Sequence, residues 1–150
     1  MTRQFMTFYL EDRFLGIEVT EVREVIRSRE VVRVPLARAG VEGLMNLRGQ
    51  IVTAIDLRSR LRLPPREASV QPMNVIVERE GGTVSLLVDE VGGVREVDED
   101  IFEEPPENLQ GEMRGLILGA FKLADELLLE LDLEEVLAVS KGTNHVLKGE

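Results

Sequence analysis

The sequence predicts an all-β fold, mainly strands with short helices, that contains two small β-barrels. Two observations lead to this prediction. Short apolar stretches, many with alternating polarity, recur along the chain between turn residues. The chain also resembles itself, because residues 17–22 match residues 86–91 at an offset of 69 and residues 55–57 match residues 131–133 at an offset of 76. Two copies of a strand-rich unit without long helices are typical of paired barrels.

The self-similarity also predicts the domain organisation. Residues 43–45 match residues 115–117 at an offset of 72, and Pro35 lies near Pro105 and Pro106 at offsets of 70 and 71. Offsets that only grow are expected if loops lengthened in the second copy of an internal duplication. We predict one domain over residues 1–139, with repeats at about 5–63 and 73–138, a proline-rich linker at 64–72, and a frayed tail at 140–150.

The composition narrows the class of protein. With 150 residues, 43% of them hydrophobic, the chain can bury the core of one domain, and no apolar run approaches the ~18 residues of a membrane span. The absence of cysteine excludes disulfides and thiolate metal sites and fits a cytoplasmic protein. A formal net charge of −10 disfavours binding to nucleic acid or directly to an anionic membrane.

The first elements are predicted from hydrophobic periodicity. Residues 5–10 and 14–17 are expected to form strands joined by a turn at 11–13. Over residues 18–26 the period changes, and Val19, Val22, Val25 and Ile26 fall at the spacing of one face of a short helix. Residues 29–34 alternate again, and Pro35 ends that strand because proline cannot donate to a ladder.

A central hairpin is predicted over residues 41–57. Two alternating apolar runs, in which the odd-numbered positions are mostly apolar, flank Arg48 and Gly49. Glycine accepts the positive φ that a tight turn requires, so Gly49 marks the turn and Arg48 lies beside it. Asp56 is the expected N-cap of a short helix over residues 57–61, since its carboxylate can accept from helix-start amides.

The second half is predicted to be strand-rich as well. Residues 73–77 and 84–88 form a hairpin, Gly92-Gly93 interrupts the chain before a strand at 94–97, and residues 103–108 form a loop. Residues 123–139 are rich in strong helix formers and favour one long helix by propensity alone. The offset of 76 predicts instead a strand at 127–131, a cap at Asp132 and a short helix at 133–138.

Groups for catalysis are scarce. The single histidine, His145, lies in the tail, so no Ser-His or Cys-His pair can form in the folded body. The carboxylates at 98–100 and 103–104 lack the spacing of a calcium loop, and the Gly-Gly pairs lack the lysine of a phosphate-binding loop. We therefore expect no enzyme activity, no cofactor and no metal site.

The central hairpin also carries a family resemblance. Gly43-Leu44-Met45-Asn46-Leu47-Arg48-Gly49, followed by Ile55-Asp56-Leu57, resembles the signature of CheW-like proteins, the chemotaxis adaptors that couple chemoreceptors to the CheA histidine kinase. The resemblance extends over about residues 5–138, through Val22-Arg23-Glu24-Val25, Leu86-Leu87-Val88-Asp89 and Leu131-Asp132-Leu133. It implies a fold of two five-stranded SH3-like or OB-like β-barrels that share a core.

The same resemblance implies partners and the residues that bind them. The expected partners are the regulatory domain of a CheA-type kinase and the cytoplasmic tip of chemoreceptors, bound by a chain that is monomeric in isolation. The partner-binding residues that carry over are Val19, Val22, Glu24, Val25, Gly43, Arg48 and Gly49. Physical reasoning adds the hypothesis that Glu24 and Arg48 pair across the surface. The valines could equally belong to the core of the chain's own fold.

Two alternatives remain open at the level of sequence. The chain could be the same scaffold in another chemosensory pathway, such as pilus-driven motility. It could also be a small-ligand-binding β-barrel, in which case a deep enclosed pocket with convergent polar groups is expected. An adaptor should instead have Glu24 and Arg48 on the surface near a shallow apolar groove.

Overall fold

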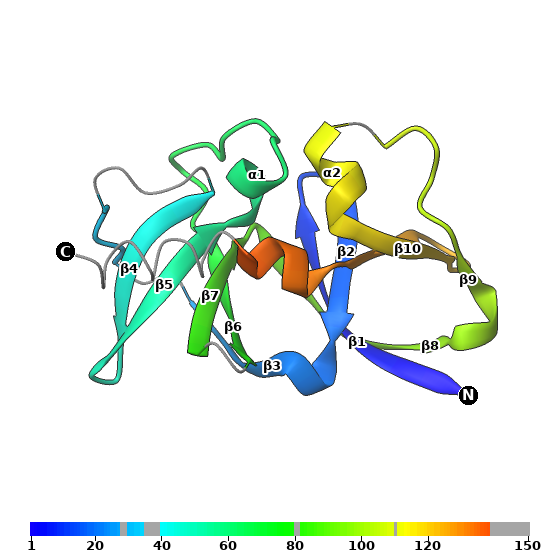
Figure 1. Ribbon diagram of the computed structural model, residues 1–150, viewed down its shortest axis with the longest axis horizontal. Coiled ribbons are helices and arrows are strands. Elements are labelled where there is room, and N and C mark those ends of the chain that lie inside the picture. Colours follow the sequence, from blue (N-terminus) through cyan, green and yellow to red (C-terminus); the bar gives the residue numbers. More distant parts are fainter. Residues whose placement is uncertain (28–29, 35–39, 80–81, 110, 139–150) are drawn as a thin grey trace.

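The computed structural model describes residues 1–27, 30–34, 40–79, 82–109 and 111–138, which form two curved sheets side by side (Figure 1). Sheet A has the strand order β8-β1-β2-β11-β10-β9, and sheet B has the order β3-β6-β7-β5-β4. The strands of sheet A are β1 (Thr2–Leu10), β2 (Arg13–Glu18), β8 (Glu90–Asp98), β9 (Phe102–Glu103), β10 (Ile117–Lys122) and β11 (Leu127–Leu131). Those of sheet B are β3 (Val22–Ile26), β4 (Val41–Leu47), β5 (Gln50–Asp56), β6 (Met73–Arg79) and β7 (Gly82–Val88).

The helices are short, as predicted. They are η1 (Val19–Glu21), α1 (Leu57–Arg60), η2 (Glu99–Ile101), α2 (Gly111–Leu116) and a helix over residues 133–138. The Asp56 carboxylate accepts from the amide of Arg58 at 3.1 Å, which confirms the predicted cap of α1. Asp132 accepts from the amide of Glu135 at 3.2 Å, and β11 precedes it, so the long helix favoured by propensity does not form.

The chain passes twice between the sheets. Strands β1 and β2 belong to sheet A, β3 to β7 belong to sheet B, and β8 to β11 return to sheet A. The first crossing is made by η1 between β2 and β3, and the second is Asp89, between β7 and β8. The strand that follows each crossing pairs antiparallel with the first strand of the other predicted repeat. Strand β3 pairs with β6, and β8 pairs with β1.

The offsets of 69 and 76 also relate the registers of the two sheets. In sheet A, the parallel pair β2–β11 places Leu15 opposite Leu129, and in sheet B the parallel pair β7–β5 places Val84 opposite Thr53. Position 84 minus the offset of 69 is position 15, and position 53 plus the offset of 76 is position 129. The two pairs are therefore equivalent under the offsets found in the sequence. An internal duplication predicts this relation, whereas the duplication itself and the repeat boundaries stay predictions.

One of the sequence matches is wrong. Gly115 lies in α2, a helix that the sequence did not predict, so it does not correspond to Gly43. Gly43 lies at a register shift opposite Ala54, and the equivalent shift in sheet A places Gly119 opposite Glu130, at the offset of 76. A Cβ at Gly43 would lie 2.1 Å from the Val32 carbonyl oxygen, and one at Gly119 would lie 2.2 Å from the ring of Phe102. Both glycines therefore allow a neighbouring segment to approach closely.

The buried apolar residues form three clusters, of which one joins the two sheets. The largest takes buried residues from both sheets, among them Phe8, Leu15, Ile55, Leu86 and Leu131, and is the shared core. Two smaller clusters belong to single sheets: sheet A packs Phe5, Phe14, Val97, Phe121 and Leu128 together, and sheet B packs Met45, Leu47, Val52, Ala54 and Ile76. The predicted mainly β fold with a shared core is confirmed, but of the two predicted five-stranded units only sheet B has five strands, and sheet A has six.

The helix predicted over residues 18–26 is wrong. Only the three residues of η1 are helical, and β3 follows directly. A register shift between Val22 and Glu24 inserts an extra residue into β3, so Val22 and Val25 both pack against the shared core although they are three positions apart. Ile26 packs instead against the cluster of sheet B. The helix-like spacing of the valines is therefore produced by a β-bulge.

The remaining predicted elements differ mainly in their ends. Strand β8 begins at Glu90, so Gly92 and Gly93 lie within it at a bulge and do not interrupt it. A Cβ at Gly92 would lie 2.7 Å from the Thr7 hydroxyl oxygen, which explains a glycine there. Of the strand predicted at 29–34, Val32 forms a bridge to Leu44. Pro35 and the tail at 140–150 lie outside the described residues.

Candidate partner-binding surface

The tip of the β4–β5 hairpin is a two-residue turn. Leu47 pairs with Gln50, and the two residues between them have positive φ, 51° at Arg48 and 87° at Gly49. Two positive φ values define the type I′ turn, which matches the twist of the flanking strands. The amide of Gly49 donates to the side-chain oxygen of Asn46 at 2.8 Å, which stabilises the turn. The predicted turn position of Gly49 is thus confirmed, and Arg48 projects from the tip.

Arg48 and Glu24 form a bidentate ion pair. Nη1 of Arg48 donates to Oε2 of Glu24 and Nη2 donates to Oε1, both at 2.6 Å. The hypothesis that these side chains pair is therefore confirmed. The hydrogen bond to Glu24, followed by its negative charge, raises the pKa of Arg48 above its ordinary value. The Arg48 side chain is 60% exposed and that of Glu24 is 23% exposed, so the pair faces solvent.

The pair joins the two ends of sheet B. Glu24 belongs to β3, the first strand in the sheet order, and Arg48 follows β4, the last. Glu24 lies opposite Ile76, which belongs to the small apolar cluster of sheet B. The ion pair thus lies across the opening of a curled sheet, with that cluster inside. A planar guanidinium that is fixed by two hydrogen bonds holds the hairpin tip in one geometry relative to β3.

An exposed apolar strip lies on the outer face of the same hairpin. Ile51, next to the turn, is 63% exposed and lies opposite Asn46, while Val32, bridged to Leu44, is 65% exposed. The sequence did not predict this exposure: residues 51–55 offer more apolar positions than one face needs, and in the structure Val52 and Ala54 point into the cluster of sheet B.

The other predicted site residues lie in two different places. Gly43 supports the hairpin from within, against Val32, and Gly49 belongs to the tip that carries Arg48. Val19, Val22 and Val25 are half-buried, and Val22 and Val25 pack against the shared core. The structure therefore brings Glu24, Arg48 and Gly49 together. It gives Val22 and Val25 a packing role on the opposite side of β3 from Glu24.

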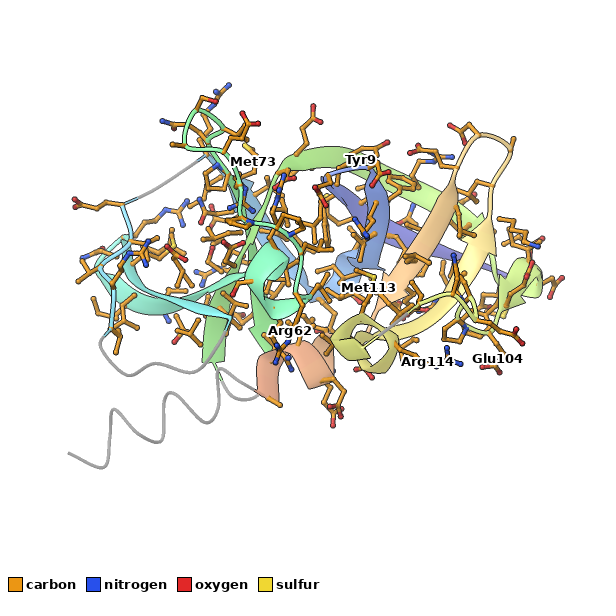
Figure 2. The ribbon with its side chains drawn as sticks, turned by 90° about the horizontal axis from the view of Figure 1, so that it is seen from above. Tyr9, Arg62, Met73, Glu104, Met113 and Arg114 are labelled. Carbon is orange, nitrogen blue, oxygen red and sulfur yellow. The ribbon has the colours of Figure 1, made fainter. Side chains whose placement is uncertain are left out.

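One sizeable cavity does not include the ion pair. It is a surface groove of about 820 Å³ between the α1 and α2 sides of the molecule, with Arg62 on one side and Met113 on the other (Figure 2). Its lining mixes apolar residues with charges of both signs, including Asp12, Arg13, Arg62 and Glu126. Two smaller grooves, of about 400 and 380 Å³, also lack Glu24 and Arg48. The groove expected beside the pair is therefore not among these three.

The described part of the chain contains neither a cluster of metal-ligating side chains nor a membrane-spanning helix. Its His, Asp and Glu side chains include no group of three or more that could hold a metal ion. None of the helices in the same residues is long and apolar enough to cross a membrane. His145 lies outside the described residues.

Comparison with known protein families tests the family resemblance of the β4–β5 hairpin. The model of the CheW-like domain matches residues 4–141. The chain belongs to the CheW-like family. A relative from Bacillus subtilis named chemotaxis protein CheW is 31% identical over 134 residues, which cover 89% of this chain and 86% of the relative. One of the same name from Treponema pallidum is 28% identical over 141 residues, covering 90% and 82%.

Two further comparisons bear on fold and on function. The crystal structure of the scaffolding protein TtCheW from Thermoanaerobacter tengcongensis superposes with a TM-score of 0.80 at 28% identity, covering 91% of this chain and 88% of that one. Protein PilI from Pseudomonas aeruginosa is 28% identical over 114 residues, which cover 76% of this chain and 64% of PilI. The family and the two-sheet fold are thus established together.

Proposed function

We propose that this chain is a non-enzymatic chemotaxis adaptor that couples chemoreceptors to a CheA-type histidine kinase in the cytoplasm. The observation that carries the proposal is the match of the CheW-like domain to nearly the whole chain, together with relatives named chemotaxis protein CheW. The similarity to TtCheW, a scaffolding protein, supports it further. An adaptor needs contact surfaces and no reacting groups, which fits the scarcity of histidine and the absence of cysteine.

The Glu24–Arg48 pair is proposed as the centre of the kinase contact. Arg48 is exposed, Glu24 is half-buried, the two side chains are held in one geometry, and the exposed Ile51 follows in the same hairpin. A charged pair beside an apolar side chain resembles the organisation of protein interfaces, in which an apolar centre is bordered by polar groups. The pair fixes the shape and the charge pattern of this surface, and the regulatory domain of the kinase recognises both.

The receptor contact is proposed near Val19, Val22 and Val25. These valines are half-buried, so they retain exposed apolar surface although two of them contribute to the shared core. Because Glu24 lies on the other face of β3, the two proposed contacts use opposite faces of one short strand. A partner on one face leaves the other face free for the second partner.

A second candidate function is the same scaffold in a pathway related to pili. The similarity to protein PilI favours it. That similarity covers less of this chain, and less of the relative, than the similarity to the CheW proteins does. We therefore place it second.

The experiment that tests the proposal is reconstitution of the three-component assembly. Purified kinase regulatory domain and a soluble receptor-tip fragment are mixed with and without this chain and separated by size-exclusion chromatography. The adaptor function predicts that receptor fragment and kinase domain elute together only when this chain is present. Elution of the two partners as separate species in its presence contradicts the proposal. Use of kinase and receptor pairs from flagellar and from pilus pathways in parallel separates the first candidate from the second.

A further inference from the structure

Asp89 is the point at which the chain leaves sheet B for sheet A. It follows β7 and precedes β8, and its side chain is only 12% exposed. Its carboxylate accepts hydrogen bonds from three segments that are distant in sequence. The amide of Glu11, in the β1–β2 turn of sheet A, donates to Oδ2 at 2.8 Å. Arg58 of α1 donates through Nε at 2.9 Å and Nη2 at 2.5 Å, and Arg66 of the linker donates through Nε at 2.8 Å.

The two arginines extend this cluster to the linker backbone and to the cap of α1. Nη1 of Arg58 donates to the carbonyl oxygens of Pro64 and Pro65, at 3.1 and 3.4 Å. Nη2 of Arg66 donates at 3.2 Å to Asp56, the residue that caps α1. The Arg58 and Arg66 side chains are 12% and 9% exposed. The linker at 64–72 is therefore tied to both sheets and is not a free spacer.

Charge balance makes the cluster a unit. Its two guanidinium groups face two carboxylates, so the four nearly buried groups carry no net charge. The more exposed Glu11 carboxylate lies 4.0 Å from Nη1 of Arg58 and pairs at 3.1 Å with Arg13. Removal of one member leaves an uncompensated charge that water reaches poorly. All four charged groups are satisfied in only one arrangement. The cluster is therefore sensitive to the relative positions of the elements that supply its side chains.

The apolar core between the sheets holds them together by close packing, but hydrophobic contact itself is non-directional. Charge-assisted hydrogen bonds, by contrast, depend on direction and distance. The Asp89 cluster supplies such directional bonds at the crossing between the sheets, where a small change in backbone direction would rotate one sheet against the other.

We propose that Asp56, Arg58, Arg66 and Asp89 form a clasp that fixes the angle between the two sheets, with Asp89 as its positioning residue. Both proposed contact surfaces lie on sheet B and η1, and Asp89 belongs to neither, so the clasp does not depend on the proposed adaptor function.

Distance measurement between the sheets tests the clasp directly. Because the chain contains no cysteine, Gln50→Cys in β5 and Glu96→Cys in β8, both at exposed positions, allow two spin labels without background. We expect a narrow distance distribution in the otherwise unchanged chain and at least a twofold broader one after Asp89→Asn. Glu78→Gln is the matched control, since it also neutralises a carboxylate paired with arginine, but at an exposed position within sheet B. Equal widths in all three proteins would overturn the clasp.

A second variant completes the test. If Asp89→Asn does not fold, Arg66→Gln removes the hydrogen bonds to Asp89 and Asp56, while Arg58 and Glu11 still donate to Asp89, and a smaller broadening is expected. A width equal to that of the unaltered chain would overturn the clasp. The distance widths decide the clasp whether or not the unaltered chain binds the kinase domain or the receptor tip.

Discussion

Glu24 and Arg48, 24 positions apart in the sequence, meet in a bidentate ion pair that spans the first and last strands of sheet B. The pair faces solvent, where water and salt screen it, so it adds little stability and its value lies in geometry. It places a guanidinium, a carboxylate and an exposed isoleucine at one end of the molecule. This relationship is the basis of the proposed kinase contact.

The first prediction concerns Gly43. A Cβ at this position would lie 2.1 Å from the Val32 carbonyl oxygen, which accepts a backbone hydrogen bond from Leu44 and cannot move away cheaply. Gly43→Ala should therefore destabilise the fold by roughly 1–3 kcal/mol, measured by urea unfolding. Gly49→Ala is the control, because no atom lies within 4 Å of its Cβ and only its positive φ is unfavourable. An equal loss in both variants would argue against the close approach.

The second prediction concerns pH and Asp89. Burial alone would raise the pKa of this carboxyl, but hydrogen bonds from Arg58, the Glu11 amide and Arg66 outweigh it and lower the pKa below 3.8. A carboxyl whose pKa is lower in the folded state stabilises the fold at pH values above its unfolded pKa. This stabilisation is lost as the pH falls through the folded pKa.

The corresponding measurement is the free energy of unfolding between pH 7 and pH 2.5. The difference between the unaltered chain and Asp89→Asn should be constant at neutral pH and should shrink as the pH falls below 3.8. Glu78→Gln, at an exposed salt bridge, should produce a much smaller difference at every pH. A difference for Asp89→Asn that does not depend on pH would contradict the lowered pKa.

The third prediction uses Tyr9, the only tyrosine of the chain. Its hydroxyl donates to the Glu126 carboxylate, with distances of 2.9 and 2.8 Å to the two oxygens, and this hydrogen bond is the main reason that its pKa is raised above 10.0. Tyrosine absorbance measured against pH should show one transition with its midpoint above pH 10.0, and Glu126→Gln should lower the pH of that midpoint. The sign implies that this bond stabilises the fold below pH 10 and is lost as the pH rises through the folded pKa. An identical transition in both proteins would show that the bond does not form in solution.

The strand content and the central hairpin could be predicted from the sequence because the signals are local. Gly49 marks the turn, Asp56 caps the following helix, and the match of residues 55–57 to 131–133 correctly replaces a long helix by β11 and a short helix. Each of these inferences depends on residues within one element or on a repeated pattern. Local chemistry is sufficient for such elements.

The failures come from features that depend on neighbouring strands. The bulge in β3 gives Val22 and Val25 the spacing of a helix, and only the pairing with β6 shows that they belong to a strand. Gly115 resembles the glycine of the hairpin in sequence, but the register assigns that place to Gly119. The Asp89 cluster joins residues 11, 58, 66 and 89, a combination that no local pattern contains.

The candidate site was predicted in part. The pairing of Glu24 with Arg48 followed from the family resemblance combined with the chemistry of the two side chains, and the structure contains it. The exposure of Ile51 and Val32 was not predicted, since the strand that contains Ile51 is apolar on both faces and the sequence alone does not say which residue is left outside. Which partner contacts these residues stays a prediction.

The most direct test of the adaptor account is the affinity of the kinase regulatory domain for charge variants of the hairpin tip. Arg48→Glu should weaken binding at least about tenfold, or about 1.4 kcal/mol, because it removes the pair and places two carboxylates together. Arg23→Glu, which changes the net charge equally on the same strand as Glu24, should leave the affinity within twofold, and both variants should unfold at nearly the same temperature as the unaltered chain. Unchanged affinity in a folded Arg48→Glu protein would contradict the account.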